Sequence, residues 1–359
     1  MIDAMKAESR GGVRARVWAL VLAGVLAFAG IAGLTVRAAS ADPTLPPLTP
    51  SELLGKVAAA RVAGLSATFE QRSDLGLPAL PAGVGDDETA TMLSLLTGTH
   101  TIRVWTAGEQ KSKVALVDGS AESAVIRNGG DVWVWSSEKQ EAVHSTLPAT
   151  KRPTSSVSNP TEAIRTMLSK LNGTTEVTTS GTGYVAGRAV YQLILTPRAT
   201  ESLIGQVRVS IDAENFVPLA LKVFADDGQE AVGVQATSVD FTVPNDSIFA
   251  FQPPAGVTVT ERAARDKGDK PSTGKPKGDA PKIYGTGWAT IAVLTMPTTT
   301  GTDQQQAKAV LDSWPAVSGS WGKGRLLSTT LLTAVITDDG RVAVGAVVPD
   351  ALYRALGSR

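Results

Sequence analysis

Between residues 65 and 260 the sequence repeats one pattern, in which short stretches carry apolar residues at every second position. The stretch "QVRVSID" places Val207, Val209 and Ile211 on one side and Arg208 and Ser210 on the other. Successive side chains of a strand point to opposite faces, so this alternation predicts strands with one buried face. Similar stretches lie at 65–71, 100–106, 114–118, 123–127, 187–197, 218–225 and 229–241. Many consecutive strands joined by short turns predict an antiparallel sheet.

Two segments interrupt the strands with helix signals. Thr49-Pro50-Ser51-Glu52 predicts a helix with Thr49 as N-cap, Pro50 at the first position and Glu52 closing a capping box, ending near Gly64. "NPTEAIRTMLSKLNG" (159–173) predicts a second helix by the same signals, with Ile164, Met167 and Leu168 on its apolar side. We therefore expect an α+β fold, a curved antiparallel half-barrel whose concave face is covered by helices.

The composition changes at several points along the chain and predicts its organisation. A proline-rich spacer (42–48) precedes the sheet unit (49–261), and a charged, Gly- and Pro-rich linker follows it (262–282). Residues 283–359 contain alternating apolar stretches and a final helix pattern "DALYRAL" (350–356), which predicts a small β-rich C-terminal domain.

The N-terminal segment (1–41) predicts export. Basic residues precede an uncharged stretch from Val17 to Val36, which has about the 20 residues needed to span a bilayer. Ala39-Ser40-Ala41 is a suitable cleavage site, so the segment is either a signal peptide or a retained membrane anchor. We expect the remainder of the chain to be exported across the cytoplasmic membrane, and to be either anchored on its outer side or released as a periplasmic or secreted protein.

The charges argue against nucleic acid as a partner. Lys and Arg balance Asp and Glu at 34 each, but residues 1–41 carry a net +3 and residues 262–282 a net +4. The rest of the chain is therefore acidic, by about 7 charges, and an acidic surface repels phosphate backbones.

The sequence offers few residues for catalysis or metal binding. It has no cysteine and only two histidines, His100 and His144, each in a predicted strand, where we expect surface or rim positions. The acidic pairs Asp226-Asp227 and Asp338-Asp339 each precede a glycine between apolar stretches, which is typical of a hairpin turn. We predict no catalytic residue, no metal site, no cofactor and no enzymatic activity.

The stretch "NGGDVWVWSSEKQEAVH" (128–144) is unusual because its strand is apolar on both faces. Trp133 and Trp135 point one way, and Val132 and Val134 point the other way. Aromatic side chains on a sheet are usually core residues, but they also suit the wall of an apolar cavity. We hypothesise that the two indoles belong to the wall or mouth of such a cavity.

The order of four segments resembles the LolA-type periplasmic lipoprotein carriers and the related RseB-type regulators of envelope-stress sigma factors. The segments are "ELLGKVAAARVAGLSATFEQ" (52–71), the tryptophan strand (128–143), the block of hairpins at 187–228, and "DSIFAFQPPAGVTVTE" (246–261). The resemblance implies a half-barrel with a helical lid around a hydrophobic cavity and no enzymatic activity. The RseB-type proteins also have a linker and a smaller C-terminal domain, as this sequence does.

The resemblance implies that acyl chains of lipids or lipoproteins are the ligand. Two functions stay open, carriage or sensing of lipids and lipoproteins in the cell envelope, or regulation through a membrane anti-sigma factor; a lipid exporter is another candidate partner. The predicted cavity residues are apolar residues of the strands and of the second helix: Phe69, Ile102, Val104, Trp133, Trp135, Ile164, Met167, Leu168, Val207, Val209, Ile211, Leu219, Leu221, Phe249 and Phe251.

Overall fold

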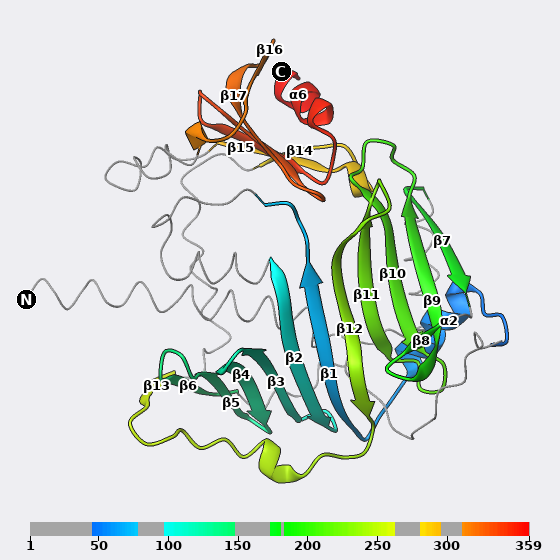
Figure 1. Cartoon of the computed structure of the whole chain (residues 1–359), viewed down its shortest axis with the longest axis vertical. Helices are drawn as coiled ribbons and strands as arrows, with labels where there is room; N and C mark the ends of the chain where they lie inside the picture. Colours follow the sequence, from blue (N-terminus) through cyan, green and yellow to red (C-terminus); the bar gives the residue numbers. More distant parts are fainter. Residues whose placement is uncertain are drawn as a thin grey trace, which may run out of the picture.

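The computed structural model describes residues 45–77, 97–147, 173–180, 183–262, 281–295 and 311–358. These residues form a 13-stranded sheet, the large sheet, and a six-stranded sheet, the small sheet. Figure 1 shows the large sheet as an open, strongly curved surface with the small sheet above one end of it. The coarse prediction of a curved, largely antiparallel sheet followed by a smaller one is therefore confirmed.

The large sheet follows the chain closely. Its order is β13-β6-β5-β4-β3-β2-β1-β12-β11-β10-β9-β7, with β8 paired to β9. The strands are β1 (Gly64–Ser73), β2 (Gly98–Ala107), β3 (Lys111–Asp118), β4 (Ala121–Asn128), β5 (Asp131–Ser136), β6 (Glu141–Thr146), β7 (Thr175–Ser180), β8 (Tyr184–Val185), β9 (Arg188–Pro197), β10 (Ile204–Asp212), β11 (Pro218–Ala225), β12 (Glu230–Asp240) and β13 (Thr258–Arg262). Within the described residues β13 is the parallel exception, since it runs alongside β6 in the same direction.

The first predicted helix is confirmed as α2 (Pro50–Ala59), with both hydrogen bonds of the capping box between Thr49 and Glu52. The helix ends at Ala59 and not near Gly64, because the chain already becomes extended at Ala60. The second predicted helix, with Ile164, Met167 and Leu168, lies outside the described residues, as does the segment from Val17 to Val36. In the part of the chain that the structure does describe, no helix has the length and apolar character required to cross a membrane.

The Asp-Gly turn predictions are confirmed in both sheets. Gly228 joins β11 to β12 with a φ of 85°, and Gly340 joins β18 to β19 with a φ of 86°. Glycine adopts this left-handed conformation without steric cost, so the neighbouring aspartates are turn residues.

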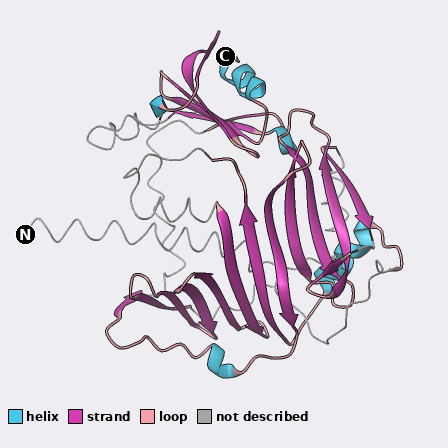
Figure 2. Cartoon of the chain, in the orientation of Figure 1, coloured by secondary structure: helices cyan, strands magenta, loops and turns pink. Residues whose placement is uncertain are grey.

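The small sheet has the order β14-β15-β19-β18-β17-β16 and carries one helix on one face (Figure 2). Its elements are β14 (Lys282–Tyr284), β15 (Ile291–Thr295), β16 (Ala316–Gly319), β17 (Gly322–Ser328), β18 (Thr333–Thr337), β19 (Arg341–Gly345) and α6 (Pro349–Gly357); the short 3-10 turns are η2 (Asp246–Ile248) and η3 (Gly287–Ala289). Leu352 of α6 and Val335 of β18 are fully buried in the core between helix and sheet.

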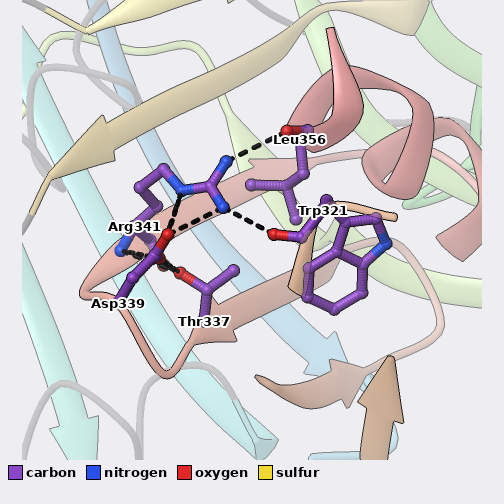
Figure 3. A network of polar contacts seen from close by, with 5 residues as sticks. All are labelled: Trp321, Thr337, Asp339, Arg341 and Leu356. Carbon is purple, nitrogen blue, oxygen red and sulfur yellow. Dashed lines mark hydrogen bonds and ion pairs between the residues drawn. The ribbon is translucent and has the colours of Figure 1, made fainter. Parts of the chain in front are cut away.

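Arg341 ties α6 to the small sheet. Its Nη1 donates to the carbonyl of Leu356 at 3.0 Å, and its Nη2 donates to the carbonyl of Trp321 at 2.8 Å (Figure 3). Hydrogen bonds from Arg341 and then from Thr337 lower the pKa of Asp339 to about 2, so the carboxylate stays charged and holds the guanidinium in place. The arginine therefore satisfies a carbonyl near the end of α6 that no helical amide reaches.

Backbone hydrogen bonds join the two sheets. Ser202, in the β9–β10 connection, forms an isolated antiparallel bridge with Val347, the Leu203 amide donates to the Ala346 carbonyl at 3.0 Å, and the Val348 amide donates to the Glu201 carbonyl at 2.9 Å. At a separate position the Thr330 amide donates to the Leu75 carbonyl at 2.9 Å. The small sheet is thus held both at the β9–β10 connection and just beyond the end of β1.

Candidate functional site

The pairing register shows which side chains share a face of the large sheet, since directly paired residues point to the same side. Phe69 is paired with Ile102, and Val209 is paired with both Leu221 and Leu193. Leu221 also pairs with Val234, and Val234 pairs with Gln71, two residues from Phe69 in β1, so Phe69 and Ile102 share the face of Leu221. Leu193 packs against Leu53 of α2, so this is the side of the sheet that bears α2. We call this side the helix face.

Helix α2 covers one end of the helix face and is anchored there. Leu53 is fully buried against Tyr191, Leu193 and Ile211. The Tyr191 hydroxyl donates to the Pro46 carbonyl at 3.0 Å, the Thr179 hydroxyl donates to the Leu48 carbonyl, and Lys56 Nζ lies 4.7 Å from the centre of the Phe216 ring. This end of the face is filled by the protein's own side chains.

A row of valines continues the helix face toward the opposite end of the sheet. Val104, Val114, Val125, Val134 and Val143 lie directly opposite one another across β2 to β6. The row is buried at Val104 and Val114 and only half-buried at Val125, Val134 and Val143. Each valine stands at an apolar position of an alternating strand, so the sequence pattern could have identified the row. The predicted cavity residues include only Val104 from it.

Between the valine row and α2 the helix face is mostly apolar, and many of its described side chains are only half-buried. Gln71 and Ser123 are half-buried polar side chains on this face and carry no charge. The other half-buried side chains there are aliphatic or aromatic: Phe69, Leu116, Leu195, Val207, Val209, Leu221, Val223, Val232 and Val234. Fully buried side chains are the usual result when a sheet packs against its own core. A continuous apolar surface that stays partly accessible is the feature expected of a site for an apolar ligand.

The two tryptophans lie on the other side of the sheet, which we call the tryptophan face. Trp133 pairs with Ile126 and His144, and Trp135 pairs with Ala124 and Ala142. Phe251, from the segment that follows β12, packs onto both indoles at ring-centre distances of 5.3 and 5.8 Å. The tryptophan strand is thus apolar on both faces because it separates two apolar layers.

The predicted cavity residues therefore divide between two faces. Phe69, Ile102, Val104, Val207, Val209, Ile211 and Leu221 belong to the helix face, and Leu219 is buried where the β10–β11 pairing shifts. Trp133 and Trp135 belong to the tryptophan face, where Phe251 covers them, and Phe249 of the same segment is 1% exposed. The prediction that all of them line one hollow is wrong, because the backbone of the sheet separates the two groups.

His144 lies at the edge of the tryptophan face, between two carboxylates. Its Nδ1 is 2.9 Å from Glu261 of β13, its Nε2 is 3.2 Å from Asp131 of β5, and its ring stacks on Trp133 at 4.3 Å. Partial desolvation opposes the charged ring, but the hydrogen bonds and charges of Glu261 and Asp131 outweigh it, so the pKa of His144 is raised above 6.5. Glu261 is 117 residues away in the chain, so no local pattern could reveal this contact.

The other histidine, His100, lies away from the position that the sequence predicts. His100 is buried in β2, and one of its ring nitrogens lies 2.9 Å from the Thr97 carbonyl, so the expectation of a surface or rim position is wrong for this residue. No group of three or more His, Cys, Asp or Glu side chains in the described ranges could hold a metal ion. What the site offers chemically is an extended apolar surface.

Comparisons with known proteins identify structural neighbours. No protein-family model matches the chain, and no curated protein matches it. A solved structure of MucB in complex with MucA is similar at 14% identity, covering 85% of this chain and 96% of the other with a TM-score of 0.44. The MucA/MucB complex of Pseudomonas aeruginosa is similar at 17% identity, covering 86% of this chain and 97% of the other with a TM-score of 0.43.

A LolA-superfamily protein from Nitrosomonas europaea is similar over a smaller part of the chain. The identity is 14%, the match covers 56% of this chain and 98% of the other, and the TM-score is 0.22. The solved structures that this chain is similar to thus include MucB, an RseB-like protein, and a member of the LolA superfamily.

Proposed function

We propose that this protein is an exported, non-catalytic LolA-like protein that binds acyl chains of lipids or lipoproteins on the helix face of its large sheet. The proposal includes the division into an acyl-binding unit (49–261), a linker (262–282) and a C-terminal unit (283–359). The observation that carries it is the uncharged surface between the valine row and α2, which extends over many strands and stays half-buried.

The energetics of acyl transfer explain why such a surface is useful. Exposing an acyl chain to water costs about 0.8 kcal/mol per methylene, so a chain of about 15 carbons costs about 12 kcal/mol. A surface that returns most of this free energy lets the chain cross an aqueous space. A surface that returned more would not release it, so an open and imperfectly packed sheet suits carriage better than a closed core does.

Only some of the predicted cavity residues belong to the proposed acyl-binding surface. We assign acyl contact to helix-face residues such as Phe69, Val209 and Leu221, and we assign Trp133 and Trp135 to the packing of the sheet against the Phe251 segment. The proposal thus predicts opposite effects for adjacent positions of one strand.

The experiment uses the full chain and a fluorescent fatty acid whose emission rises in an apolar environment. Val234→Lys introduces a charge on the helix face, and Gln235→Lys introduces the same charge one residue later on the opposite face. We expect Val234→Lys to abolish binding and Gln235→Lys to retain it, with both variants unfolding cooperatively on heating. Equal binding by the two variants, or no binding by the unmodified chain, would refute the proposal.

A second candidate function is regulation through a membrane anti-sigma factor. The observation in its favour is the small sheet, which has a core of its own and is fixed to the large sheet by backbone hydrogen bonds. A photo-crosslinking residue in place of the exposed Leu332, followed by mass spectrometry of the captured protein, tests it. Capture of a membrane protein that controls a sigma factor supports regulation, whereas capture of a lipid exporter or of lipoproteins alone supports carriage.

A further inference from the structure

The small sheet has one closed face and one open face. On the side of α6 its strands contribute Val293, Val335 and Ala343, which are 8%, 0% and 0% exposed. On the other side the pairing register aligns a set of half-buried apolar side chains together with the buried Ala334 and with Arg325; the half-buried ones are Ala292, Leu294, Leu327, Ile336, Val342 and Val344. Ile283 extends this second side with 59% of its side chain exposed. We call it the open face of the small sheet.

The open face is turned toward the large sheet. Figure 1 shows α6 on the side of the small sheet that points away from β1 and β2. The hydrogen bond between Thr330 and Leu75 places the β17–β18 connection, at the rim of the open face, against the chain that leaves β1. The backbone bridge between Ser202 and Val347 fixes the small sheet at a second point, so the orientation of the open face is held at two positions.

The chemistry of the open face suits a hydrocarbon chain. Protein interfaces are enriched in Tyr, Trp, Phe, Met and Arg, and their strongest contacts come from aromatic residues and arginine. Arg325 pairs with Ile336 on this side, but its guanidinium is held by the Asp312 carboxylate and the Trp314 carbonyl. The other aligned side chains named above are Ala, Leu, Ile and Val. The aliphatic part of this surface gives a methylene chain full contact, and the guanidinium of Arg325 is already bound within the chain.

We propose that the open face of the small sheet is a second wall of the acyl-binding site, which contacts the distal part of a long chain whose proximal part lies on the helix face. This inference rests on the proposed function. It adds that the small sheet sets chain-length preference: a short chain is held by the large sheet alone, and a long chain reaches both sheets.

The test compares two adjacent positions of β17 in the full chain. Leu327→Lys places a charge on the open face, and Ser328→Lys places it one residue later, where the side chain is exposed and points to the other side. The probes are laurate and stearate, measured by displacement of the fluorescent fatty acid. Each methylene that loses contact changes the dissociation constant about fourfold, so loss of a few methylenes weakens stearate binding by more than about tenfold.

We expect Leu327→Lys to weaken stearate binding by at least this factor and to leave laurate binding unchanged, while Ser328→Lys leaves both unchanged. Leu327→Ser, a milder change, should show the same selectivity in case the lysine variant does not fold. Equal binding of stearate by Leu327→Ser and the unmodified chain overturns the inference but leaves the proposed function intact. An equal loss of both fatty acids overturns it as well.

A second copy of this chain is the alternative occupant of the open face, and a change of oligomeric state would reveal it. If light scattering shows a dimer that Leu327→Ser dissociates without affecting stearate binding, the open face joins two copies of this chain and the inference is wrong. If the unmodified chain binds neither fatty acid, the proposed function fails together with it.

Discussion

The two helices α2 and α6 each cover an apolar sheet face, but they leave very different areas uncovered. A helix of about ten residues is about 15 Å long, the width of about three strands spaced at about 4.8 Å. In α6, Ala351, Leu352, Ala355 and Leu356 are buried, and they close one face of a narrow sheet. In α2 only Leu53 is buried, and the sheet beneath it is more than twice as wide. The proposed acyl-binding surface is thus the part of the large sheet that its described helix is too short to reach.

The largest expected effect comes from the part of the tryptophan face that the Phe251 segment covers. Trp135 is 9% exposed and packs against Phe251. We expect Trp135→Ala to lower the free energy of unfolding by about 3 to 5 kcal/mol, the usual cost of removing a large core aromatic. Denaturant unfolding measures this change. Fatty-acid binding per folded molecule should be unchanged, and a selective loss of binding would return Trp135 to the site.

The sequence could predict the strands of the large sheet but not which of its faces another segment covers. Alternation identified most strands, because a side-chain period of two follows from backbone geometry alone. The capping box of Thr49 and Glu52 identified the start of α2 for a similarly local reason. Alternation does not show which apolar face another element covers. Phe251 reaches Trp133 from more than 100 residues away, so the tryptophan strand could not be assigned to core or cavity from its own residues.

The contact of Arg341 with α6 gives the next largest expected effect. Arg341→Met keeps much of the apolar stem but removes the hydrogen bonds to the Leu356 and Trp321 carbonyls. Hydrogen bonds from a charged group contribute about 1.5 to 3 kcal/mol, so we expect a loss of that size in the free energy of unfolding. Without the arginine, the pKa of Asp339 should also rise from about 2 toward its ordinary value of 3.8. An unchanged pKa, followed by NMR titration of the carboxylate, would contradict the assigned role of Arg341.

The anchor of α2 offers a smaller and more selective change. Tyr191→Phe removes the hydroxyl that donates to the Pro46 carbonyl and leaves the ring stacked on Phe216. We expect a loss of about 0.5 to 1.5 kcal/mol in the free energy of unfolding. Amide exchange of α2 should accelerate more than that of α6. Equal acceleration in both helices would show that the hydroxyl stabilises the whole chain and does not specifically anchor α2.

The smallest expected effect concerns β13, the parallel edge strand. Glu261 of this strand and Asp131 of β5 both face the His144 ring, and their hydrogen bonds raise its pKa above 6.5. A raised pKa in the folded state means that protonation stabilises the fold. This contribution is fully present below pH 6.5 and is lost as the pH rises through the raised value.

Glu261→Gln should lower the pKa of His144 and reduce the dependence of stability on pH across this window, whereas Glu138→Gln, in the β5–β6 turn, should not. NMR titration of the His144 ring measures the first effect, and unfolding at pH values on either side of the window measures the second. If β13 is held by its backbone pairing alone, both variants will retain the same pH dependence as the unmodified chain.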